Sequence, residues 1–126
     1  MTVVLDSSAV LAVLLQEKGA ETMVPYIGTA QISSANLAEV IARLQDRQAS
    51  EEQIAGVVAE FLPRTHAMSP AQGVSAGRLR ATTRHLGLSL GDRCCLALAL
   101  DLNARVLTTD RAWAKLDIGV EVEVIR

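Results

Sequence analysis

Three aspartates stand at the ends of runs that favour regular secondary structure. Asp6 closes the β-branched run "TVVLD" at residues 2–6, and Asp110 closes "ARVLTTD" at residues 104–110. Asp92 lies near the start of the apolar segment "LSLGDRCCLALAL". A carboxylate beside a buried helix costs free energy unless something at that place uses its charge. The three positions therefore raise the question of whether their carboxylates meet.

In open α/β sheets, ligands bind beyond the carboxyl ends of the strands, where the strand order reverses. Asp6 and Asp110 lie side by side there if their strands are neighbours. Glu39, in a helix expected over residues 34–47, leans over the same crevice. Clustered carboxylates repel one another unless they hold a cation. Mg²⁺ or Mn²⁺ accepts such oxygen ligands and assists displacement at phosphorus, so the pattern favours metal-dependent phosphodiester hydrolysis.

Each acid also has a purely structural interpretation. Asp6, Asp92 and Asp110 are suited to be helix N-caps or first-turn acids. Glu39 is suited to pair with Arg43, four residues later on the same helix face. The spacing alone leaves both interpretations open.

The pattern predicts alternating strands and helices in one domain, residues 1–126. Strands are expected at 2–6, 30–33, 65–68, 104–110 and 120–125, and helices at 7–17, 34–47, 50–62, 69–87 and about 92–103, with short helices from Gly19 and over 111–116. Half of the residues are hydrophobic, enough for a sizeable core. This alternation predicts an open, mostly parallel α/β sheet with helices on both faces.

The composition excludes several classes of protein. Aromatic residues make up 2% of the chain, which argues against a base-stacking platform. Cys94 and Cys95 are adjacent, so they are poor disulfide partners and read as small core residues in a reducing compartment. No apolar run is long enough to span a bilayer, and no basic leader is present. We therefore expect a cytoplasmic protein without a zinc site.

Four segments resemble, in order, the acidic motifs of PIN-domain nucleases. They are "VVLDSSAVLAVLL", "SSANLAEV", "LSLGDRCCLALAL" and "VLTTDRAW". More closely, nearly the whole chain resembles the VapC-type toxins of bacterial VapBC toxin–antitoxin pairs. The resemblance implies a PIN-like three-layer α/β/α fold with a five-stranded parallel sheet of order 3-2-1-4-5.

The resemblance also implies the composition of the site. Asp6 and Asp92 would be the principal ligands of Mg²⁺ or Mn²⁺, and Asp110 and Glu39 would complete the shell directly or through water. One of these four carboxylates, with Glu39 as a candidate, would help to deprotonate the attacking water.

Other residues match positions near the site of the family. Ser7, Ser8 and Thr109 match small hydroxyl residues that orient a ligand or donate to phosphate, with helix capping as the alternative. Arg93 is expected to contact substrate or to pair with an acid. Two pairs of arginines, Arg43 with Arg47 and Arg80 with Arg84, are spaced four residues apart, and we hypothesise that at least one pair contacts RNA phosphates.

The implied function is that of an endoribonuclease toxin that hydrolyses RNA and is inhibited by a VapB-type antitoxin. Surplus apolar residues in segments 7–17 and 50–62 favour this protein partner or a homodimer. An inert PIN-like binding module is the alternative, although all four acids are present. A haloacid-dehalogenase-like phosphatase is disfavoured because Ser8 stands where its second aspartate belongs. A phosphoacceptor receiver domain is disfavoured because it needs a lysine after its last strands, and Lys115 lies in the wrong context.

Overall fold

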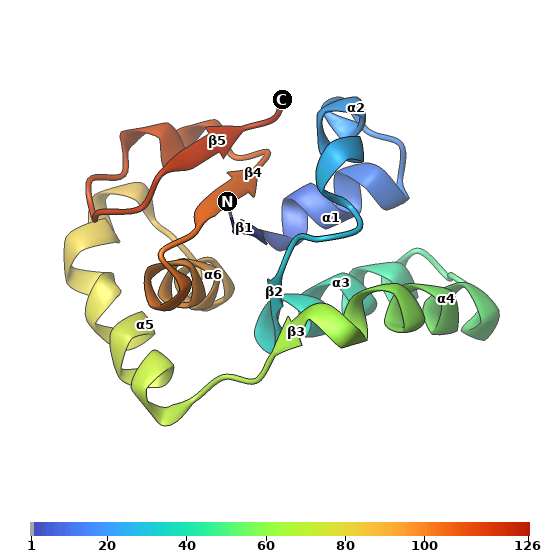
Figure 1. Cartoon of the computed structure of the whole chain (residues 1–126), viewed down its shortest axis with the longest axis horizontal. Coiled ribbons are helices and arrows are strands. Elements are labelled where there is room, and N and C mark those ends of the chain that lie inside the picture. Colours follow the sequence, from blue (N-terminus) through green and yellow to red (C-terminus); the bar gives the residue numbers. More distant parts are fainter. Residues whose placement is uncertain (1) are drawn as a thin grey trace.

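The computed structural model describes residues 2–126, in which short strands alternate with helices (Figure 1). The strands are β1 (Val3–Leu5), β2 (Ile32–Ser33), β3 (Thr65–His66), β4 (Arg105–Thr108) and β5 (Val122–Val124). The α-helices are α1 (Ser7–Leu14), α2 (Ala20–Met23), α3 (Ser34–Asp46), α4 (Glu51–Phe61), α5 (Pro70–Thr83) and α6 (Leu90–Leu102). Short 3-10 helices occur at Val24–Tyr26 (η1), Leu62–Arg64 (η2), Arg84–Leu86 (η3) and Arg111–Lys115 (η4). The alternation expected from the sequence is confirmed.

The strands form two parallel sheets. β4 pairs with β1 on one side and with β5 on the other, so that Val106 lies opposite both Val4 and Val122. β2 and β3 form the second sheet. A bridge between Val4 and Gln31 joins the two, and the Leu5 amide donates a 2.9 Å hydrogen bond to the Gln31 carbonyl.

The expectation of one continuous five-stranded sheet of order 3-2-1-4-5 is therefore wrong. The ladder between β1 and β2 stops at the Gln31 bridge because the chain turns almost at once into α3. Ser33, the last residue of β2, is already the N-cap of that helix, and its side chain accepts a 3.2 Å hydrogen bond from the Ala35 amide. A two-residue strand is too short to extend pairing along β1.

The side chains of β1 enter two separate cores. Val3 and Leu5 pack with apolar residues of α1, α3 and α4, whereas Val4 packs with α6 and with Trp113. Successive side chains of a strand point to opposite faces, so helices must cover both sides of it. Figure 1 shows α5 and α6 on one side of the strands and α1 to α4 on the other.

Helix α6 is buried over most of its circumference. Six consecutive residues from Cys94 to Ala99 are buried, which explains why this segment is apolar all round. Both cysteines are free thiols within this core, as expected. No helix within residues 2–126 combines the length and apolar character needed to cross a membrane.

Three helix boundaries differ from expectation. Helix α1 ends at Leu14 rather than at residue 17. Helix α6 begins at Leu90 rather than near Asp92, because Ser89 and Asp92 form a capping box. Helix α5 ends at Thr83, and the η3 turn continues the chain to Gly87. Gly87 has a φ of 62°, the left-handed conformation that glycine adopts without strain at a helix terminus.

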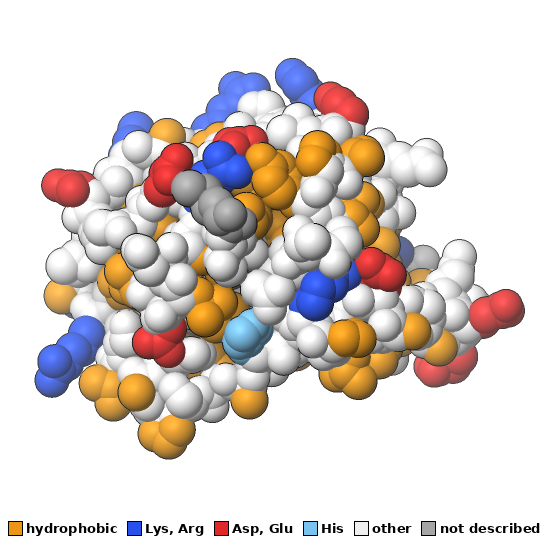
Figure 2. All heavy atoms as spheres, in the orientation of Figure 1, with side chains coloured by type: hydrophobic (Ala, Val, Ile, Leu, Met, Phe, Trp, Pro, Cys, Tyr) orange, Lys and Arg blue, Asp and Glu red, His pale blue; other side chains and the backbone are white. Residues whose placement is uncertain are grey.

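The surface carries mixed charge, in keeping with a formal net charge of −2. On the face shown in Figure 2, Lys and Arg side chains are scattered among acidic ones and are not gathered into one basic patch. On this face, a polyanion would therefore meet only scattered cations.

Candidate active site

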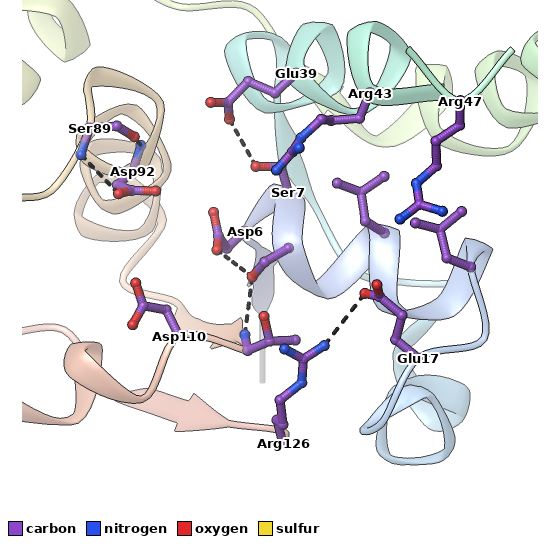
Figure 3. Close-up of a pocket in the computed structure, with 14 residues that line it drawn as sticks. Asp6, Ser7, Glu17, Glu39, Arg43, Arg47, Ser89, Asp92, Asp110 and Arg126 are labelled. Carbon is purple, nitrogen blue, oxygen red and sulfur yellow. Dashed lines mark hydrogen bonds and ion pairs between the residues drawn. The ribbon is translucent and has the colours of Figure 1, made fainter. Parts of the chain in front are cut away.

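The carboxyl ends of β1 and β4 open into a cavity of about 430 Å³ that is also walled by α3 and α6 (Figure 3). The four predicted acids all line it, as do the three predicted hydroxyl residues: Asp6, Glu39, Asp92 and Asp110, with Ser7, Ser8 and Thr109. The fold thus brings together side chains that are up to about a hundred positions apart in sequence, because parallel strands end at the same edge.

Asp6 is the most deeply buried of the four acids, with 3% of its surface exposed. Its Oδ2 accepts hydrogen bonds of 2.6 Å from the Ser8 hydroxyl and 2.9 Å from the Thr108 hydroxyl. Asp6 occupies the N-cap position of α1, yet its side chain makes no capping hydrogen bond there. The capping alternative therefore does not explain this carboxylate.

The hydroxyls of Ser8 and Thr108 connect Asp6 to the turn that follows β4. Each hydroxyl donates its one proton to Asp6, so each hydroxyl oxygen can accept a hydrogen bond from another donor. The Ser8 oxygen accepts from the Thr109 amide and the Thr108 oxygen from the Asp110 amide, each at 3.1 Å. This arrangement ties the Asp6 carboxylate to the backbone that carries Asp110.

The environment of Asp6 disfavours its charge. Burial raises the pKa of Asp6 to about 6; the hydrogen bonds from Ser8 and Thr108 lower it, and the charges of Asp92 and Glu39 raise it. The second oxygen, Oδ1, is buried and has no hydrogen-bond partner within residues 2–126. An unpartnered buried carboxylate oxygen among other acids is the environment that a cation stabilises.

Glu39 is held by neighbours other than Arg43. Its Oε1 accepts hydrogen bonds of 2.8 Å from the Ser7 hydroxyl and 2.9 Å from the side-chain amide of Asn36. No ion pair joins Glu39 to Arg43 in the part of the chain that the structure describes. The helix-surface pair offered by their spacing does not form, because the carboxylate turns into the cavity.

Asn36 supports the cavity from behind, and the sequence reasoning missed it. It is completely buried, and its Nδ2 donates both to Glu39 and, at 3.1 Å, to the carbonyl of Gly91. A β-carbon at Gly91 would overlap both carboxylate oxygens of Glu39. The sequence signal that could have revealed Asn36 is its position as a polar residue on the apolar helix face that also carries Leu37 and Val40.

Asp92 and Asp110 each combine capping with exposure to the cavity. Asp92 Oδ2 accepts a 2.9 Å hydrogen bond from the Ser89 amide, and Asp110 Oδ1 accepts a 3.0 Å bond from the Ala112 amide. Burial raises the pKa of Asp92, and the hydrogen bonds with Ser89 lower it. The charges of Glu39 and Asp110 raise the pKa further. One oxygen of each acid thus secures a turn, which leaves the other for a ligand.

Arg93 is the predicted site residue that the structure does not bring to the cavity. Its Nη1 donates a 3.0 Å hydrogen bond to the carbonyl of Ala76, which ties α6 to α5. The adjacent residue Asp92 faces the cavity, and neighbouring side chains on a helix point about 100° apart. Thr108 is the other contributor that the sequence reasoning missed, although it lies at the end of β4.

The residues fit a hydrated divalent cation better than a fully ligated one. No three His, Cys, Asp or Glu side chains in the described chain stand close enough to form a preassembled metal cluster. Mg²⁺ needs only one or two direct carboxylates, because it keeps several waters and takes substrate oxygens. The unpartnered Oδ1 of Asp6 and the oxygen-only donor set suit such an ion.

A sequence profile of the PIN domain family matches residues 3–119. The chain therefore belongs to the PIN domain family, as the four acidic motifs predicted. A sequence comparison with curated proteins gives no significant match.

Solved structures with the same fold include several that carry VapC or VapBC in their names. VapBC2 from Rickettsia felis, bound to a promoter DNA fragment, has a TM-score of 0.73 at 20% identity, covering 98% of each chain. DNA-bound VapBC from Salmonella typhimurium has a TM-score of 0.74 at 18% identity, covering 98% of this chain and 97% of that one. VapC20 from Mycobacterium tuberculosis, described as a sarcin–ricin loop cleaving toxin, has a TM-score of 0.73 at 13% identity. The match covers 95% of this chain and 99% of that one.

Proposed function

We propose that this protein is a metal-dependent endoribonuclease of the VapC toxin type, which hydrolyses RNA phosphodiester bonds and is inhibited by a VapB-type antitoxin. The observation that carries the proposal is the convergence of Asp6, Glu39, Asp92 and Asp110 on one cavity, with Asp6 buried and incompletely hydrogen-bonded. VapC20, which has a similar fold and is described as a sarcin–ricin loop cleaving toxin, supports RNA as the substrate.

Asp6 and Asp92 are the residues that would hold Mg²⁺ or Mn²⁺, with Asp110 and Glu39 completing the shell directly or through water. Such an ion neutralises the carboxylates and stabilises the charge that develops on the phosphodiester oxygens during displacement. Glu39 is the candidate for taking the proton from the attacking water. Its Oε1 is occupied by Ser7 and Asn36, whereas Oε2 accepts no hydrogen bond from residues 2–126 and stays available.

A second hollow, of about 590 Å³, supports a protein partner. It lies between α1, α3 and α4, and its apolar lining includes Leu14, Leu44, Val57 and Phe61. The antitoxin would lay an apolar segment along this hollow, beside the acidic cavity, with which it shares Leu15 and Arg47. We further propose that the protein acts in the cytoplasm as a homodimer.

The test is cleavage of total RNA by the purified protein with Mg²⁺, with Mn²⁺ and with EDTA. Asp92→Asn is the informative variant, because an asparagine oxygen can still accept from the Ser89 amide and preserve the capping box. Asp117→Asn, an exposed acid outside the cavity, is the matched control. We expect metal-dependent cleavage that Asp117→Asn retains and Asp92→Asn loses by more than about 100-fold.

The other outcomes are equally decisive. Equal residual cleavage by the wild-type protein and Asp92→Asn would indicate a contaminating nuclease. Absence of cleavage by antitoxin-free protein with either metal would support the alternative, an inert PIN-like binding module. Inhibition is tested by adding the purified antitoxin to the same reaction.

A further inference from the structure

Basic side chains line the same cavity as the acids, and Glu17 also lies on the side of Arg47. Figure 3 shows Asp6, Asp92 and Asp110 on one side and the guanidinium group of Arg47 on the other. Arg43 and Arg126 also line the cavity. A site that cuts a polyanion with a group of carboxylates repels its own substrate. Cations beside the carboxylates would reduce this repulsion.

Arg43 and Arg47 are cations for which residues 2–126 offer no structural partner. Arg43 lies on α3 and Arg47 is its C-cap residue. Both are exposed, and neither makes a hydrogen bond or an ion pair through its side chain with any other residue in the range 2–126. The acid best placed to neutralise Arg43 is Glu39, four residues earlier, and it is turned instead toward Ser7 and Asn36.

Arg126 differs from this pair. Its guanidinium lies 3.5 Å from the carboxylate of Glu17 and 3.5 Å from the carbonyl of Lys18. Part of its charge is therefore already compensated. Arg43 and Arg47 are one helical turn apart on the same face of α3, so they present two uncompensated charges to one wall of the cavity.

The other pair of arginines is placed differently. Arg80 lies near the end of α5 and Arg84 in the η3 turn, and neither lines the cavity. The structure thus separates two pairs that the sequence left equivalent. Leu11 of α1 and the C-cap residue Leu15 add an apolar stretch to the wall of the same cavity, suited to contact with a sugar or a base.

We infer that Arg43 and Arg47 bind the backbone phosphates of the RNA strand next to the phosphodiester that is cleaved at the carboxylates. This inference rests on the proposed function and adds to it the path of the substrate: the strand runs from the carboxylates along α3. The contacts are to phosphate, so they position RNA of any sequence.

The test measures binding without cleavage. The probe is a fluorescein-labelled, mixed-sequence single-stranded RNA, titrated by anisotropy in EDTA at several salt concentrations with the Asp92→Asn protein as parent. Arg43→Gln/Arg47→Gln is compared with Arg80→Gln/Arg84→Gln, a pair of identical spacing and charge. We expect the first pair to weaken binding roughly tenfold or more and to reduce the slope of log K against log salt by about 1.4.

Arg43→Lys/Arg47→Lys should restore most of the salt slope, because lysine keeps the charge. An unchanged slope in Arg43→Gln/Arg47→Gln would overturn the inference, and so would a larger loss in the Arg80/Arg84 variant. Unchanged RNA binding together with weaker binding of the antitoxin would assign α3 to the protein interface and would also overturn it. Both pairs are exposed, so circular dichroism and melting should match the parent.

Failure of this inference is distinguishable from failure of the proposed function. Metal-dependent cleavage by the wild-type protein tests the function and does not depend on which arginines bind RNA. The salt slope tests the arginines and requires no cleavage.

Discussion

The buried side-chain amide of Asn36 donates a 2.9 Å hydrogen bond to the carboxylate of Glu39, one turn later on α3. The same nitrogen donates to the carbonyl of Gly91, directly before Asp92 on α6. One amide therefore sets the position of two acids that come from different helices. It acts through those acids, so Asn36 is a positioning residue.

Replacing Asn36 with alanine should impair cleavage without unfolding the protein. Glu39 would lose a hydrogen bond and the Gly91 carbonyl its partner, a cost of about 1–3 kcal/mol in stability. We expect a loss of about 10- to 100-fold in activity or metal affinity, as is typical for residues that orient metal ligands. Gln72→Ala is the control, because Gln72 is also buried and bonds an acid outside the cavity, Asp101, at 2.8 Å. Equal activity loss in both variants would mean that Asn36 acts only through stability.

Gly91→Ala should displace the carboxylate of Glu39 because the added methyl group occupies its position. Gly77→Ala is the matched control on α5, where an added β-carbon meets no neighbouring atom within 4 Å. The control should be neutral or more stable by about 0.5–1 kcal/mol, as expected for glycine to alanine inside a helix. Cleavage should fall in Gly91→Ala alone. If Gly91→Ala cleaves RNA at the wild-type rate, the exact placement of the Glu39 carboxylate is unimportant for cleavage.

The stability of the metal-free protein should decrease as pH rises through the pKa of Asp6. The folded protein holds this proton more tightly than the unfolded chain, since burial raises the pKa to about 6. The stabilisation is complete at low pH and is lost as Asp6 ionises, by up to about 3 kcal/mol. The loss begins above the unfolded pKa of 3.8 and is complete above the folded pKa. Thermal unfolding in EDTA at pH 5 and pH 8 therefore measures about half of it.

Asp6→Asn provides the comparison for that measurement. The variant has no charge to bury, so it should melt above the wild-type protein at pH 8 and differ less at pH 5. Added Mg²⁺ should raise the melting temperature of the wild-type protein at pH 8 and leave that of Asp6→Asn nearly unchanged. A wild-type stability that rises from pH 5 to pH 8 in EDTA would contradict the assignment.

The thiols of Cys94 and Cys95 should be unreactive in the folded protein. Burial raises the pKa of both, and most strongly that of Cys95, which is fully enclosed in the core. A thiol-specific chromogenic reagent should therefore give almost no signal under native conditions and two equivalents after unfolding. Rapid labelling of the native protein would show that α6 opens more readily than its packing indicates.

Much of the fold was predictable because its signals are local. Serine caps, proline and glycine near helix termini, and the β-branched runs around Val4 and Val106 mark most element boundaries within a residue or two, although α1 and α5 end three and four residues earlier than expected. The convergence of Asp6 and Asp110 follows from the same pattern, since the strands are parallel and their carboxyl ends share an edge. The sheet was mispredicted as continuous because no local signal reveals that β2 ends after two residues.

The sequence by itself determined the alternation of strands and helices, because period and order along the chain decide where strands end and helices begin. The spacing of the acids left their convergence open, and the resemblance to the acidic motifs of PIN-domain nucleases named all four. The tertiary structure alone decided which oxygen each acid leaves free, that Glu39 turns to Ser7 rather than to Arg43, and that Arg93 faces α5. These choices depend on hydrogen bonds between residues far apart in the chain, such as the one from Asn36 to Gly91. Side-chain orientation is set by the packed environment, which spacing along one element does not specify.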